Sequence, residues 1–167
     1  MELKTKINAE DGKQELTITR EFDLPLELLF KAYADPEIVA QWMGTKVVKL
    51  ENKKQGGYQF ETSDPKGNKH VFSGAIHDVI PNKKITRTFE MENTPFPAQL
   101  EFLEFEKITD AISKLTMHVI YRSVELRDQI LKMPFAAGIN MAHNRLQEII
   151  SKLKKNLLKT KILNLNL

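Results

Sequence analysis

The chain of 167 residues is long enough for one domain with a substantial buried core. It has no cysteine, which excludes a disulfide framework, a thiolate nucleophile and a cysteine-based metal site. The formal net charge is +3, but five lysines lie between residues 152 and 161, so the rest of the chain carries about −2. A nucleic-acid-binding face needs concentrated positive charge on the fold itself, and the sequence does not predict one.

The N-terminal 15 residues are polar, with charges where a secretory signal peptide needs an apolar core. No apolar run approaches the roughly 20 residues of a membrane-spanning helix. We therefore expect a cytoplasmic protein without a membrane span. The expected division is a polar segment at 1–15, a single domain at 16–155 and a basic tail at 156–167.

Two interpretations of the C-terminal end stay open. The lysine run is typical of a solvated, fraying helix end, since positive charge is favourable at a helix C-terminus. Residues 161–167, however, alternate apolar and polar side chains, which is also typical of an added strand.

The first elements along the chain are a strand and two short helices. Residues 16–22 alternate apolar and polar side chains, which predicts a strand with one buried face. Arg20 falls on the apolar side, so we expect it either near the strand end or paired. Asp35-Pro36 separates two helical segments, because the residue before proline avoids helical geometry whereas proline is tolerated at a helix start. Gly44 fits the C-cap of the second helix.

Six further strands follow, joined by short connections that predict an antiparallel meander. Gly74 in the middle of a long strand predicts a bulge or a sharp bend. The strand at 99–108 has apolar residues on both faces, so either a bulge near Phe102 reconciles them or its outer face is partly covered. The six predicted strands span 46–50, 58–62, 69–80, 84–92, 99–108 and 112–122.

Residues 123–153 form the longest helical pattern, with apolar residues at steps of three and four from Phe135 to Leu153. Pro134 predicts a kink or break near Met133, because proline removes a backbone hydrogen bond and clashes with the preceding turn. The first piece is then either a lid over a cavity or simply a segment that lets the helix follow a curved sheet. Gly138, without a side chain, predicts a close approach of the helix to the sheet.

These elements predict an α+β helix-grip fold. We expect a curved antiparallel sheet of six or seven strands, two short helices after the first strand, and a long C-terminal helix packed over the concave face. Residues 18–44 carry the sequence ITREFDLPLELLFKAYADPEIVAQWMG, and residues 74–89 carry GAIHDVIPNKKITRTF. Both segments resemble the START-like superfamily called SRPBCC.

The resemblance extends over about residues 16–155. It is closest to the branch that contains the C-terminal domain of the activator of the heat-shock-protein-90 ATPase. The chain departs from the pattern in the proline of its terminal helix, in Ile139 after the internal glycine, and in Thr88-Phe89 at the end of the returning strand. The branch has no shared catalytic residues to carry over, so the resemblance implies a cavity protein rather than one enzyme class.

A curved sheet gripped by a helix predicts an apolar cavity in which a few polar groups set specificity. The alternative is that the same aromatic and methionine side chains simply pack as core. Strand parity and the resemblance together give the predicted lining: Trp42, Phe60, Phe72, Ile76, Arg87, Phe89, Phe102, Met117, Val119, Tyr121, Met133, Phe135 and Met141.

Arg87 is the most informative of these residues, because it falls among apolar positions. A buried guanidinium needs an acid or an anionic ligand, so Arg87 is either in an internal ion pair or available to a carboxylate or phosphate. The four histidines have no spacing typical of metal ligands, and no catalytic residue, metal or cofactor is predicted.

Three functions stay open. The first is binding of a small apolar or amphipathic molecule in the cavity, by a monomer or weak homodimer. The second, implied by the resemblance, is a co-chaperone or stress-related interaction domain. The third is a cyclase-like enzyme, which would need an acid–base pair inside the cavity and has the least support.

Overall fold

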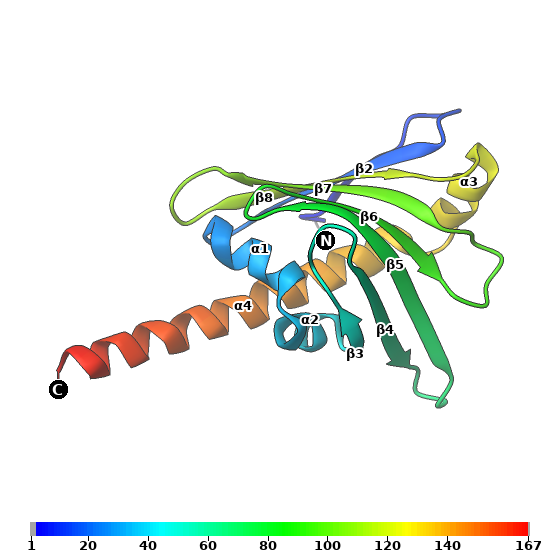
Figure 1. Ribbon diagram of the computed structural model, residues 1–167. Helices are drawn as coiled ribbons and strands as arrows, with labels where there is room; N and C mark the ends of the chain where they lie inside the picture. The colour runs from blue at the N-terminus through cyan, green and yellow to red at the C-terminus, as the bar shows by residue number, and fades with distance from the viewer. Residues whose placement is uncertain (1–2, 167) are drawn as a thin grey trace.

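The computed structural model of the chain describes residues 3–166, which form one antiparallel sheet with helices across one face (Figure 1). The strands are β1 (Lys6–Asn8), β2 (Glu15–Phe22), β3 (Lys46–Leu50), β4 (Gly57–Ser63), β5 (Lys69–Ile80), β6 (Lys84–Met91), β7 (Gln99–Lys107) and β8 (Ser113–Ile120). The helices are α1 (Leu26–Ala34), α2 (Pro36–Met43), α3 (Val124–Lys132) and α4 (Phe135–Leu165). The predicted helix-grip architecture is confirmed.

The sheet order is β1-β2-β8-β7-β6-β5-β4-β3. Strands β3 to β8 follow one another as a meander, and β2 joins the far side of β8 in continuous register from Glu15↔Ile120 to Phe22↔Ser113. Strand β1 pairs with β2 and makes the sheet one strand larger than expected. Its three residues, KIN, alternate exposed and half-buried, and so short a polar run gives no periodic signal.

Alternation along the strands defines the inner face of the sheet. On β8, Leu115, Met117 and Val119 are buried, and the residues between them are not. On β2, Leu16 and Ile18 are buried beside them. These side chains merge with those of α1, α2 and α4 into one hydrophobic core, so the concave side of the sheet is the side that the helices fill.

The middle of β5 departs from regular pairing close to Gly74. A Cβ atom at Gly74 would lie 2.1 Å from the carbonyl oxygen of Thr88 and 2.6 Å from the ring of Tyr58. Only glycine therefore fits, and the Tyr58 ring covers its backbone while the phenol donates a hydrogen bond to the Thr88 carbonyl. The pairing of β5 with β6 then shifts between Ile76 and Asp78. This is the bulge that the mid-strand glycine predicted.

The two short helices begin and end as their sequences predict. The Asp35 side chain accepts hydrogen bonds from the backbone N–H groups of Glu37 and Ile38, which caps α2 directly before Pro36. Gly44 ends the same helix with a φ of 61°, a left-handed conformation that favours glycine. Trp42 of α2 donates its indole N–H to the Ala32 carbonyl of α1, 2.6 Å away, which ties the pair together.

Pro134 divides the terminal helical pattern into α3 and α4, as predicted. The apolar stripe of α4 packs against the core through Leu146 and Ile150, both buried. Gly138 does not make the predicted close approach, since a Cβ atom there would meet nothing within 4 Å. It lies exposed in the first turns of α4, away from the buried stripe.

The end of the chain is helical rather than a strand. α4 continues to Leu165 and extends beyond the edge of the sheet (Figure 1). Leucine and lysine favour helix, and no glycine or proline interrupts residues 139–166. Among the helices of residues 3–166, none is both long and apolar enough to cross a membrane.

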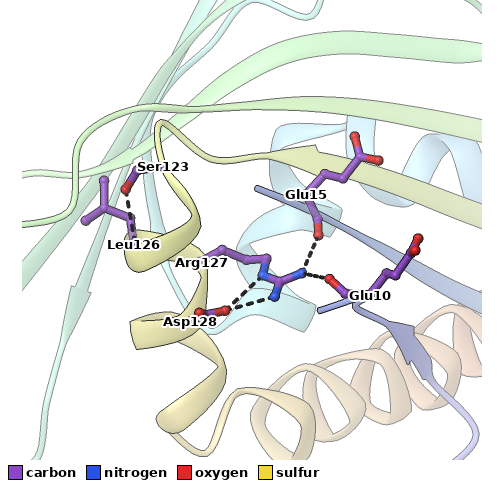
Figure 2. Close-up of polar contacts among 6 residues, drawn as sticks. All are labelled: Glu10, Glu15, Ser123, Leu126, Arg127 and Asp128. Carbon is purple, nitrogen blue, oxygen red and sulfur yellow. Dashed lines mark hydrogen bonds and ion pairs between the residues drawn. The ribbon is translucent and has the colours of Figure 1, made fainter. Parts of the chain in front are cut away.

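Helix α3 is attached to the N-terminal part of the chain by one buried arginine (Figure 2). Arg127 is 2% exposed. Its guanidinium donates to the carbonyl oxygens of Glu10 at 2.6 Å and Glu15 at 3.2 Å. It also contacts the partly exposed carboxylate of Asp128 at 2.9 Å, and Ser123 caps the start of the helix. The position of α3 thus depends on the loop between β1 and β2.

Candidate functional site

An apolar pocket lies at the corner where α3 meets α4, against the ends of strands β6 to β8. Its volume is about 280 Å³. Phe89 and Met91 come from β6, Ile130 from α3, and Phe135 from the start of α4. The other lining residues are Gln99, Tyr121, Met133 and Pro134. Two polar side chains in an apolar wall is the composition typical of a small-molecule site.

The pocket exists because Pro134 interrupts the helix beside it. Met133 has an extended conformation, with φ −73° and ψ 162°, so the chain turns there and α4 starts anew at Phe135. The Met133 side chain is 45% exposed and forms part of the rim. On the sheet side, Phe89 points inward and stacks on Phe72 of β5. The break thus leaves space that a continuous helix would fill.

Three polar side chains connect the pocket wall with the interior of the sheet. Gln99 donates a hydrogen bond to Glu101 Oε2 at 2.8 Å. The other carboxylate oxygen of Glu101 accepts from Arg87 Nε at 3.0 Å, and both members of this ion pair are largely buried. The guanidinium of Arg87 also lies over the Tyr58 ring, 5.1 Å from its centroid. Each charge therefore already has a partner within the fold.

The pKa values of the buried groups keep Arg87 charged and the phenols neutral. Burial by itself disfavours the charged guanidinium, but the adjacent Glu101 carboxylate raises the pKa of Arg87 above its ordinary value. Burial raises the pKa of Tyr58, Tyr33 and Tyr121. Tyr121, which lines the pocket, is thus a protonated phenol that can donate or accept one hydrogen bond.

No metal site is formed by the part of the chain that the structure describes: residues 3–166 contain no group of three His, Asp or Glu side chains placed to hold an ion. Asp64 and His70 lie 3.3 Å apart in an exposed hairpin, where the backbone and side chain of Asn68 lower the pKa of Asp64. His118 is 2.9 Å from Glu15 on the outer face of the sheet. None of these four residues lines the pocket described above.

The chain matches a known family over most of its length. Residues 23–151 match the model of the family described as "Activator of Hsp90 ATPase homolog 1-like protein". The chain belongs to this family. The resemblance inferred from the sequence motifs is therefore confirmed. No curated protein matches the chain.

Solved structures of similar proteins share the fold of this activator-of-Hsp90-ATPase-like chain. A crystal structure from Mycobacterium smegmatis has a TM-score of 0.77 at 24% identity, covering 87% of this chain and 95% of that one. A solution structure from Arthrobacter aurescens has a TM-score of 0.79 at 13% identity, covering 88% and 91%. A crystal structure from Nitrosomonas europaea has a TM-score of 0.75 at 19% identity, covering 87% and 99%.

The structure brings some of the predicted lining residues together at the pocket of this family member. Phe89, Tyr121, Met133 and Phe135 line it directly, whereas Phe72 and Arg87 lie behind its wall, against Phe89 and Tyr58 respectively. The remaining inward-facing residues are buried in the core and do not line the pocket: Trp42, Phe60, Ile76, Met117 and Val119.

Two predicted residues point elsewhere. Phe102 pairs with His118 in the register of β7 and β8 and stacks on its ring, on the outer face of the sheet. The predicted bulge that would turn Phe102 inward is absent, since β7 pairs without a shift with both neighbours. Met141 is 64% exposed, because it lies on the face of α4 opposite the buried stripe. Both assignments to the cavity were wrong.

Sequence reasoning missed Gln99 and Glu101, the polar residues beside the pocket. Because Leu103 and Phe105 face inward, β7 parity also turns Glu101 inward, directly opposite Arg87 in the register. A signal for Glu101 was present: a buried arginine on one hairpin strand requires an acid, and the neighbouring strand offers one at matching parity. The apolar outer residues Leu100 and Phe102 obscured that signal.

Proposed function

We propose that this protein binds a small, mainly apolar molecule in the corner pocket between the sheet and the α3–α4 break. The observation that carries the proposal is the pocket wall itself, six apolar side chains with Gln99 and Tyr121 among them. Its volume, about 280 Å³, is near the lower limit of about 300 Å³ for ligand pockets. A compact ligand of one or two rings, or a short chain, fits this size.

The electrostatics of the wall favour a neutral ligand. Arg87 and Glu101 neutralise each other, and Gln99 uses one amide N–H on Glu101. The Tyr121 phenol and the remaining polar atoms of Gln99 supply the directional contacts, so the ligand needs one hydroxyl, carbonyl or amine group. We do not extend the proposal to catalysis, because the Glu101 carboxylate is held by Arg87 and Gln99 on both oxygens.

A pair of methionine variants tests the proposal. The probe is 2-naphthol, a neutral two-ring fluorophore with one hydroxyl group, titrated against the full-length protein. M133W places a larger side chain at the pocket rim and should weaken binding at least about tenfold through lost space. M141W makes the same change at an exposed methionine outside the pocket and should leave the Kd unchanged.

Circular dichroism confirms that both variants fold. Absence of saturable probe binding to the wild type, or equal weakening by M133W and M141W, would contradict the pocket assignment. Native mass spectrometry of protein purified from its source adds an independent observation, since a bound small molecule should appear as an added mass that M133W reduces.

A chaperone interaction is the second candidate, and one feature besides the family name favours it. The outer face of the sheet has an apolar hollow of about 530 Å³ beside Ala75, Leu100 and Phe102. The measurement is the ATPase rate of a purified Hsp90 with and without the protein. Stimulation that F102D removes, but L163D on α4 does not, supports this role. No change in the ATPase rate argues against it.

A further inference from the structure

The end of α4 forms a surface that the family description does not cover. The family match ends at residue 151, whereas the helix continues to Leu165 and extends away from the sheet (Figure 1). Large apolar side chains are exposed along this extension, with Leu158 at 51%, Ile162 at 58% and Leu165 at 84% exposure. Such side chains cost free energy in water, so their repetition on one short segment requires an explanation.

Helical spacing gathers these three residues into one narrow stripe, whereas Leu157 and Leu163, 56% and 66% exposed, lie off it. Leu158, Ile162 and Leu165 are separated by four and three residues, so they lie above one another on one face. At 100° per residue, lysines fall on both sides of the stripe. Lys154 and Lys161 flank one side, and Lys155 and Lys159 flank the other.

The charge of the extension has one sign. No Asp or Glu occurs after Glu148 in the sequence, and Lys152 pairs with that residue at 3.1 Å. Within residues 3–166, no ion pair is formed by Lys154, Lys155, Lys159 or Lys161. Four uncompensated positive charges therefore border the apolar stripe on an element that is otherwise in water.

An apolar stripe bordered by lysines fits one kind of partner better than the others. A second copy packed stripe against stripe would bring lysines of both chains together, which is unfavourable. Nucleic acid would use the lysines but leave the apolar stripe without a role. The surface of a bilayer with anionic phospholipids uses both, because lysines beside the stripe reach the headgroups while leucines enter the acyl boundary.

We propose that residues 152–166 bind the surface of membranes that contain anionic phospholipids. The helix lies in the plane of the interface and does not span the bilayer. The site is separate from the corner pocket, so it neither requires nor excludes a ligand there. Its consequence is that the domain is held at a lipid surface by an extension beyond the residues that match the family model.

Vesicle flotation tests the proposal with the full-length protein. The vesicles consist of phosphatidylcholine with or without phosphatidylglycerol, at low and at physiological salt. Wild type should bind the anionic vesicles, and the bound fraction should fall as the salt concentration rises. It should not bind vesicles of phosphatidylcholine alone. K155Q/K159Q should bind about 25-fold more weakly, at roughly fivefold for each lysine removed. L158S/I162S should weaken binding at least about tenfold.

The matched control is K53Q/K54Q, which removes two exposed lysines from the loop between β3 and β4 and has the same net charge as K155Q/K159Q. It should bind like wild type, as should the pocket variant M133W. The proposal is overturned if anionic vesicles do not bind, or if K53Q/K54Q loses as much binding as K155Q/K159Q. Two other outcomes would overturn it if vesicle binding is absent. One is binding of the extension to duplex DNA, and the other is a dimer that L158S/I162S abolishes.

Discussion

A buried polar cluster joins the N-terminal segment to α4 at the level of single residues. Arg20 donates to Thr5 Oγ1 at 3.2 Å and lies 3.4 Å from Asn140 Oδ1, and the Thr5 hydroxyl is 2.9 Å from His143 Nδ1. All four residues are buried. Within residues 3–166, Arg20 Nε is the one buried side-chain polar atom without a hydrogen-bond partner. The expected pairing of Arg20 is thus with neutral groups rather than with an acid.

This cluster makes folding stability depend on pH through His143. Burial, and then the nearby charge of Arg20, lowers the pKa of His143 from 6.5 to about 4. Above pH 6.5 the folded and unfolded states are both neutral at this residue. As pH falls below 6.5 the unfolded state takes up the proton first, so stability is lost until the folded state also binds it near pH 4.

We expect H143Q to remove this contribution, because glutamine does not titrate. Between pH 7 and pH 4.5, the unfolding free energy of wild type should fall by about 2.5 kcal/mol more than that of H143Q. Urea unfolding at each pH measures the difference. H77Q, which removes an exposed histidine from β5, is the control for loss of one histidine. Parallel pH profiles for wild type and H143Q would show that His143 does not carry the effect.

At the scale of elements, the attachment of α3 decides whether it acts as a lid or as a wall. The break at Pro134 permits movement, but Arg127 holds the first half of α3 to the carbonyl groups of Glu10 in the β1–β2 loop and Glu15 at the start of β2 (Figure 2). Movement of α3 away from the pocket would break the hydrogen bonds from Arg127 to both carbonyl groups and leave the guanidinium with Asp128 alone. Such a loss is costly, so the structure favours a fixed wall.

R127M tests the attachment. Loss of the charged hydrogen bonds should lower the unfolding free energy by about 3 kcal/mol. Amide hydrogen exchange along Val124–Lys132 should become faster than in wild type, because α3 then opens locally. The control is K132M, which removes an exposed lysine from the same helix. If α3 exchanges equally in R127M and K132M, the arginine is not what holds it.

The sequence predicted those elements whose chemistry is local. Asp35-Pro36, Gly44 and Pro134 each impose a backbone conformation on their neighbours, and each helix boundary was found where expected. Clean alternation on β8 likewise predicted its inner face. The orientation of β7 was not predictable in this way, because apolar residues occur on both of its faces and the register with β6 and β8 decides between them.

At the scale of the whole molecule, the unpredicted features arise from contacts between distant segments. Strand β1 has too few residues for a periodic pattern and is held by pairing with β2. The corner pocket depends on where Pro134 meets the ends of three strands, and periodicity alone does not fix that position. The fold therefore followed from patterns within segments, whereas the candidate site required the segments to be placed together.

The open sheet also bears on how the protein avoids aggregation. An antiparallel sheet with eight strands in open order has two free edges, β1 and β3, where unpaired backbone groups could add a strand from another molecule. The β1 edge offers only three residues. The β3 edge has exposed Lys46 and Lys49 and a register irregularity between Val47 and Lys49. Short length, lysine and irregular pairing each oppose edge-to-edge growth, so strand addition is disfavoured at both ends of the sheet.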